Sequence, residues 1–213
     1  MGILRSGIFG GFSNKTGANI GRIVNGVNVV TGLHHRRTSP RAASEEQNSR
    51  KFALLMNYLS LMNPLIAIGF RQFTKNNKPL NAAYKFNFPT AFEGEAEILS
   101  INYPAIVYSK GNACRPSCLT LTPAVNSVVF EWATESQTCY SRKNDKATFL
   151  IFNTEKGFFL ARQAAALRQD LSYGFALPPD FAGDELHCYM NFNSADGKLT
   201  GESTYAGAIV LAG

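Results

Sequence analysis

Few residue patterns in the chain have the composition of a catalytic or metal-binding site. Cys114 and Cys118 form a CxxxC pair, which would suit zinc only with a second pair of ligands at comparable spacing. No such pair follows, and His34, His35 and His187 lie far from the two cysteines in sequence. Three interpretations of the pair stay open, namely free thiols, one disulfide, or a structural zinc site.

Acid–base chemistry has equally few candidates. His34 and His35 belong to a basic segment typical of a solvated linker. His187 alternates with apolar residues, so we expect it on the outward face of a strand. Asp184 and Glu185 follow a turn signal and are expected in solvent, and the GxSxG and HExxH patterns do not occur. We therefore predict that the protein is not an enzyme, has no catalytic or metal-binding residues and requires no cofactor.

The N-terminal segment is rich in glycine and does not have enough apolar residues for a hydrophobic core of its own. Eight glycines occur in the first 33 residues and separate short β-branched pieces such as 20–24 and 27–31. Asn25-Gly26 between these pieces predicts a β-hairpin. The glycines do not form the GxGxxG or Walker patterns of a phosphate loop. No apolar run has the length of a secretory signal or a membrane span, so we expect a chain that is soluble when made.

A basic linker, residues 34–41, leads into a predicted helix. Ser44 and Gln47 have the spacing of a capping box, and apolar residues recur at three- and four-residue steps from Phe52 to Met62. Pro64 should kink the helix, which gives a bent helical segment near residues 40–73. The apolar stripe is typical of a core or of a subunit interface.

From about residue 93 the sequence becomes rich in β-branched and aromatic residues divided by turn signals. Strict alternation in 127–132 and 186–193 predicts strands that each bury one face, as in a two-layer sandwich. We therefore predict an α+β fold, with a hairpin arm and helical region over residues 1–92 and a β-sandwich over 93–213. The expected strands are 96–103, 105–109, 118–121, 127–132, 147–152, 158–160, 171–176, 186–193 and 203–211.

The charge is divided unevenly along the chain. Residues 1–92 hold twelve Lys/Arg against two acidic residues, whereas residues 93–213 hold nine Lys/Arg against thirteen Asp/Glu. A basic half can attract nucleic acid, an anionic surface or the acidic half of another copy. Head-to-tail contacts between copies generate open polymers when the rotation does not close.

Part of the chain resembles a fibronectin type III-like module. The resemblance covers about residues 95–213 and rests on the tryptophan-bearing strand, the segment LPPDFAGDELHCYMNFNSADGK and the closing ESTY. It implies an antiparallel sandwich. One position departs from the pattern, because Leu186 stands where a tyrosine corner is expected.

A second resemblance covers nearly the whole chain. The phrases GIFGGFSNKTG, ASEEQNSRKFALLMNYL, GFRQF, LNAAYKFN, VYSKG and LPPDFAGDELHCYM are similar to an uncharacterised domain-of-unknown-function family of Gram-negative bacteria. Its QxxRxF helix corresponds to Gln47, Arg50 and Phe52. The resemblance implies no activity. A similar SxxQxxxRxxF phrase occurs in some phage structural proteins.

These features together favour a structural role. We expect copies of this chain to be its partners, in a filament, a surface appendage or a virion-like particle. An adhesion or ligand-binding sandwich is the alternative, and nucleic-acid binding through the basic half is a weaker one, because no exposed aromatics interleave with the arginines. We expect synthesis in the cytoplasm. The predicted interface residues are the apolar anchors Ile8, Phe9 and Phe12 and the cations Arg36, Arg37 and Arg41.

Overall fold

Residues 3–4, 10–24, 26–33, 40–74, 78–94 and 98–211 are described by the structure, a computed structural model. For residues 3–4 only the backbone is described. Contacts between residues divide the chain between Glu46 and Gln47 into two compact units, 1–46 and 47–213. The change in composition lies elsewhere, near residue 93. The unit boundary and the change in composition differ because the helical segment from Gln47 onward packs on the outer face of one sheet of the sandwich and shares a hydrophobic core with it.

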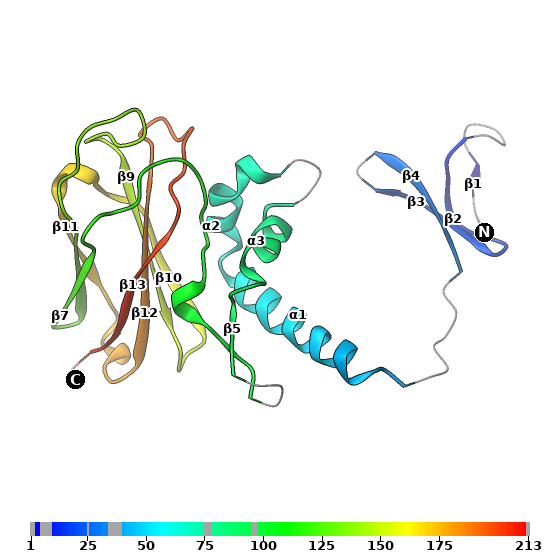
Figure 1. The fold of residues 1–213 in the computed structure, drawn as a ribbon, viewed down its shortest axis with the longest axis horizontal. Helices are drawn as coiled ribbons and strands as arrows, with labels where there is room; N and C mark the ends of the chain where they lie inside the picture. The colour runs from blue at the N-terminus through cyan, green and yellow to red at the C-terminus, as the bar shows by residue number, and fades with distance from the viewer. Residues whose placement is uncertain are drawn as a thin grey trace. The chain divides into compact units, whose positions relative to one another are not determined.

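The first unit contains a four-stranded antiparallel sheet with the order β1-β2-β3-β4 (Figure 1). Its strands are β1 (Ile3–Leu4), β2 (Phe12–Thr16), β3 (Asn19–Val24) and β4 (Val27–Gly32). Val24 pairs with Val27, and Gly26 has a φ of 80°. The hairpin predicted from Asn25-Gly26 is therefore confirmed, although Asn25 itself lies outside the described residues.

The helical region begins with α1 (Ala43–Leu61) and α2 (Asn63–Gly69), whose axes differ in direction by 85°. The kink predicted at Pro64 is thus confirmed, with the proline in the first turn of α2. A 3-10 turn, η1 (Arg71–Phe73), and α3 (Pro79–Asn87) follow. Among the described residues no single helix is long and apolar enough to cross a membrane, and α1 and α2 pass that test of length and composition only as a bent pair.

Seven strands of the second unit form a β-sandwich. One sheet has the order β10-β9-β12-β13 and the other the order β11-β8-β7, with every pair antiparallel. The fold is therefore α+β with a β-sandwich, as predicted. The strands are β7 (Thr120–Ala124), β8 (Ser127–Glu131), β9 (Lys146–Asn153), β10 (Phe158–Leu167), β11 (Ser172–Ala176), β12 (Glu185–Asn193) and β13 (Thr204–Val210).

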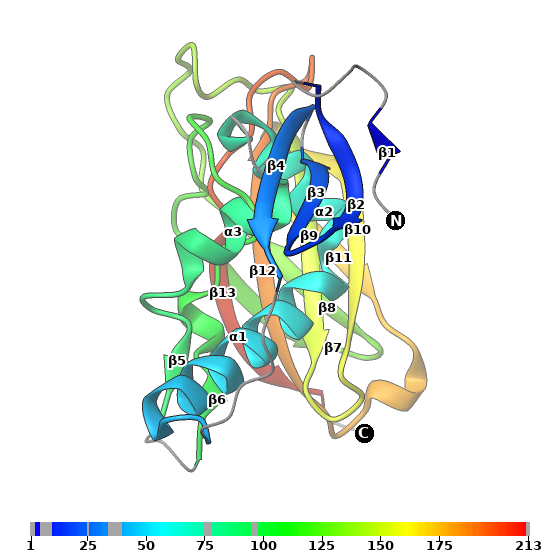
Figure 2. The same cartoon turned by 90° about the vertical axis from the view of Figure 1, so that its right-hand side faces the viewer.

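The two central strands of the four-stranded sheet, β9 and β12, are buried on both faces, contrary to the prediction that each strand buries one face. Along β9, Phe149 and Ile151 contact the core between the two sheets, whereas Leu150 and Phe152 contact a second core that includes Leu59 of α1. Figure 1 shows α2 beside this sheet, opposite β7 and β11, and Figure 2 shows β9 and β12 behind the helices. A helical layer explains why alternation in 186–193 does not separate buried from exposed positions.

The segment before the sandwich is less regular than predicted. In place of strands over 96–103 and 105–109, the chain forms the short pair β5 (Phe92–Glu93) and β6 (Ser100–Ile101), then the 3-10 turn η2 (Tyr103–Ala105). The backbone N–H groups of Tyr108 and Ser109 donate to the Ser203 hydroxyl, at 3.0 and 3.4 Å, instead of to a neighbouring strand. The Ser203 side chain thus takes the place of the neighbouring strand with which a strand over 105–109 would pair.

Candidate functional site

Residues that could carry covalent or metal chemistry do not converge in the described parts of the chain. No group of three His, Cys, Asp or Glu side chains there could hold a metal ion. All four cysteines are described, and each is a free thiol. Cys188 is buried in β12, and burial raises the pKa of its thiol to about 12. Such a thiol stays protonated at neutral pH, so Cys188 behaves as a small core residue.

His187 is buried, so the prediction of an outward position is wrong. Its ring stacks on Tyr103 at a centroid distance of 4.1 Å, and its Nδ1 lies 2.8 Å from the Tyr205 hydroxyl. The cause is η2, which places Tyr103 over this face of β12. Burial lowers the pKa of His187, and the nearby charge of Glu185 opposes that shift. The imidazole is a neutral, hydrogen-bonded part of the core.

Tyrosines form a buried polar layer beside His187. The Tyr58 and Tyr189 hydroxyls lie 3.3 Å apart, and the Tyr189 hydroxyl donates to the Tyr103 carbonyl at 2.9 Å. The Tyr108 hydroxyl donates to Asn191 Oδ1 at 2.9 Å. Burial raises the pKa of Tyr58, Tyr108 and Tyr189 well above the ordinary tyrosine value. These phenols are neutral and each has a hydrogen-bond partner, which fits a role in packing.

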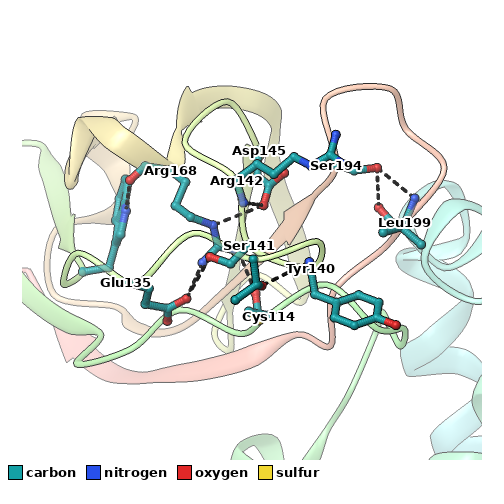
Figure 3. Close-up of polar contacts among 11 residues, drawn as sticks. Cys114, Glu135, Tyr140, Ser141, Arg142, Asp145, Arg168, Ser194 and Leu199 are labelled. Carbon is teal, nitrogen blue, oxygen red and sulfur yellow. Dashed lines mark hydrogen bonds and ion pairs between the residues drawn. The ribbon is translucent and has the colours of Figure 1, made fainter.

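A charged network joins the loops at one end of the sandwich (Figure 3). The Arg168 guanidinium is buried, with Nη1 2.9 Å from Glu135 Oε2 and Nε 3.3 Å from Asp145 Oδ2. Its Nη2 donates to the Cys114 carbonyl at 2.8 Å. The guanidinium carbon also lies 3.8 Å from the centre of the Phe192 ring. Every part of the cation has a partner, so the network fixes loops and lines a neighbouring cavity of about 230 Å³.

The predicted interface residues fall partly outside the described parts of the chain. Ile8, Phe9, Arg36 and Arg37 lie outside the described residues. Phe12 is half-buried in β2, and Arg41 is exposed before α1. The Phe12 ring lies over Gly21, because a Cβ added to Gly21 would meet the ring at 2.6 Å.

The N-terminal sheet exposes aliphatic side chains on both faces. Gly21 is its only buried residue within β2, β3 and β4. The register places Ile23 and Val30 on one face and Val24 and Val27 on the other. Their relative exposures are 63%, 55%, 43% and 63% in that order. A sheet normally buries one face against another layer, so this sheet lacks a hydrophobic core of its own.

A second cavity, of about 490 Å³, lies between α3 and residues 70–73, which follow α2. Three phenylalanine rings line it, with Phe70 in ring contact with both Phe73 and Phe86 at centroid distances of 6.1 Å. The Lys110 ammonium lies 3.7 Å from the centre of the Phe86 ring. Asn81, Ala82 and Lys85 of α3 complete the lining.

Sequence reasoning did not identify the residues of either cavity. Arg168 follows an alanine-rich stretch that gives no sign of a buried cation. Lys85 and Lys110 are separated by 24 residues, and no periodicity links them. The segment VYSKG contains Lys110, but only the fold brings that lysine over a ring of α3.

The fold described above is that of an α+β protein with two different parts. One is a small exposed sheet, and the other is a β-sandwich covered by helices. A family model described as a family of unknown function (DUF6266) matches residues 11–207. The chain belongs to this family. No curated protein matches it. It is similar to the crystal structure of chicken CNTN1 FN1–FN3 domains, with a TM-score of 0.38 and 9% identity over 49% of this chain and 34% of that chain.

Proposed function

We propose that the protein is a non-enzymatic structural subunit that self-assembles through its N-terminal sheet, in a filament, surface appendage or virion-like particle. The observation that carries this proposal is the exposure of Ile23, Val24, Val27 and Val30 in a sheet without a core. Covering these side chains with another copy would stabilise the assembly by about 25 cal/mol for each Å² of apolar surface removed from water.

Charge complementarity favours a copy of the same chain as the partner. Residues 1–46 hold six Lys/Arg and two Glu, whereas residues 93–213 have an excess of four acidic residues. A basic arm is therefore attracted to the acidic sandwich of a neighbour. Such a contact is heterologous and can repeat without closing, which is the geometry of a filament.

The sandwich offers one strand edge suited to accept the arm. Three of its four edge strands carry a feature that hinders strand addition: Pro123 in β7, and register shifts where β10 pairs with β9 and where β13 pairs with β12. Strand β11 has neither proline nor charge, and its five residues pair with β8 without interruption. We take the outer edge of β11 as the acceptor for β4, itself the last strand of its sheet.

Point variants of the full-length chain test both surfaces. Val24→Thr with Val27→Thr keeps the β-branched shape but removes apolar surface, so the association constant should fall about tenfold or more. Gly174→Lys should weaken association by placing a cation on the acceptor edge opposite a basic arm. Sedimentation velocity over a concentration series, with electron microscopy of the largest species, measures both effects.

Matched controls are available. Val125→Thr changes a valine that is 89% exposed in the turn between β7 and β8, and Gly174→Ala adds no charge to β11. Both should assemble as the unaltered chain does. A full-length chain that sediments as a monomer at every concentration, or that assembles equally well without residues 1–33, would contradict the proposal.

A ligand-binding sandwich module is the second candidate function. The observation that favours it is the aromatic-lined cavity between α3 and residues 70–73.

A further inference from the structure

We infer that the cavity between α3 and residues 70–73 binds an apolar monocarboxylate, a compound with one carboxylate on an aliphatic or aryl body. Its volume of about 490 Å³ lies within the range of roughly 300–1,000 Å³ typical of small-molecule sites. The walls supply the two features that such a compound needs. Phe70, Phe73 and Phe86 provide apolar surface, and the lining residues Lys85 and Lys110 provide positive charge.

The two lysines are available to an anion. Salt bridges elsewhere in the described parts of the chain join Lys156 to Asp184 and Arg115 to Glu202. Neither Lys85 nor Lys110 has a carboxylate partner among the described residues. The Lys110 ammonium instead lies over Phe86 at 3.7 Å and within 5.7 Å of the Phe73 ring centre. A cation over a ring keeps hydrogen-bond donors for an incoming carboxylate, because the ring uses only one side of the ammonium.

The segment that carries Lys110 is held from several directions, so the site is formed before a ligand arrives. The Lys110 N–H donates to the Gly69 carbonyl at 3.2 Å, and the Thr200 hydroxyl donates to the Lys110 carbonyl at 3.0 Å. Three residues earlier, Val107 exchanges hydrogen bonds of 2.8 Å with the buried amide of Asn87 in α3. Pre-formed walls reduce the entropy cost of binding.

The positive charge of this cavity also distinguishes it from the surface that is proposed to accept the N-terminal arm. The N-terminal arm is basic and would be repelled by two lysines that have no carboxylate partner in the described part of the chain, so a second copy's arm is not the expected occupant of the cavity. The inference therefore does not depend on self-assembly. It can be tested on the chain in any oligomeric state.

Calorimetric titration of the full-length chain with decanoate, below its micelle concentration, tests the inference. Decanoate should bind to one site, whereas decanol, which has no charge, and decyltrimethylammonium, which has the opposite charge, should bind at least about tenfold more weakly. Titration with 3-phenylpropionate distinguishes an aryl from an aliphatic ligand body. NMR shifts on binding should cluster at residues 70–73, 81–86 and 110.

Variants with a matched control connect binding to the named residues. Lys110→Met and Lys85→Met should each weaken decanoate binding several-fold and leave decanol binding unchanged. Lys51→Met is the control, because Lys51 also lies over a ring, that of Phe92 at 5.6 Å, but does not line the cavity. Thermal unfolding of each variant confirms that it is folded. Absence of decanoate binding to the unaltered chain, or equal affinity for decanoate and decanol, would overturn the inference.

Discussion

At the scale of single residues, the buried charges and polar groups of this protein serve its architecture. Arg168 shows this most clearly, because one guanidinium reaches Glu135 and Asp145 in the connection between β8 and β9 and the Cys114 carbonyl in the segment before β7. The Trp132 indole donates to the Arg168 carbonyl at 2.8 Å, so the backbone of this residue is fixed as well. Loops at this end of the sandwich depend on a single cation.

Replacing Arg168 should therefore be costly. Arg168→Met leaves the buried carboxylate of Asp145 and that of Glu135 without their cation, and should lower the free energy of unfolding by about 3–5 kcal/mol. Arg142→Met, in the same loop region but on an exposed side chain, should change it by less than about 0.5 kcal/mol. Urea unfolding followed by Trp132 fluorescence measures both. Equal stabilities for the two variants would show that the network contributes nothing.

His187 should make stability depend on pH. Its pKa is lowered in the folded state, so the unfolded chain binds more protons near the ordinary histidine pKa of about 6.5. The contribution of His187 is fully present above that value and is lost as the pH falls below it. The urea midpoint should decrease between about pH 7.5 and pH 5.5. His187→Gln should show a smaller decrease over the same range, and an equal decrease in both proteins would assign the effect to other groups.

At the scale of elements, the helical layer is joined to the sandwich by close backbone contact. Gly69 ends α2 against the segment that holds Tyr108 and Ser109. A Cβ at Gly69 would lie 2.6 Å from Ser109 Cα and 2.7 Å from the Tyr108 carbonyl oxygen. Both are backbone atoms and cannot move aside independently. The glycine is required for proximity, because its backbone does not have a positive φ.

Gly69→Ala should consequently destabilise the protein although alanine favours helices. The overlap should cost about 1–3 kcal/mol and exceed the gain of about 1 kcal/mol in helix propensity. Gly174→Ala provides the control, since no atom lies within 4 Å of the added Cβ and its φ is not positive. Thermal unfolding compares the two. A Gly69→Ala variant at least as stable as the unaltered chain would mean that α2 can withdraw from the sheet at little cost.

At the scale of the whole molecule, the distribution of charge should govern association between copies. Raising the salt concentration from about 0.1 M to about 1 M shortens the Debye length from about 10 Å to about 3 Å. Attraction between a basic arm and an acidic sandwich would then weaken, so the assembled fraction should fall. Light scattering along a NaCl series measures this. An assembled fraction that rises with salt would indicate that apolar burial alone drives association.

The local sequence determined a large part of this architecture. Asn25-Gly26 specified the hairpin of β3 and β4, because glycine readily adopts the positive φ that the turn requires. Pro64 specified the kink between α1 and α2, since a proline cannot continue the helix hydrogen bonds. Alternation in 127–132 located Val128, Phe130 and Trp132 on the buried face of β8 and beyond. Each of these signals acts over a few residues.

Tertiary structure decided what lies on the second face of each element. The helices cover the sheet of β9 and β12, so His187 and Tyr189 are buried although their sequence pattern matches an exposed face. Only folding brings Lys110 over Phe86, or Arg168 to Glu135 and Asp145, because those partners are far apart in the chain. The periodicity of a strand indicates which side chains share a face. It does not indicate which other element packs against that face, because that depends on the tertiary structure.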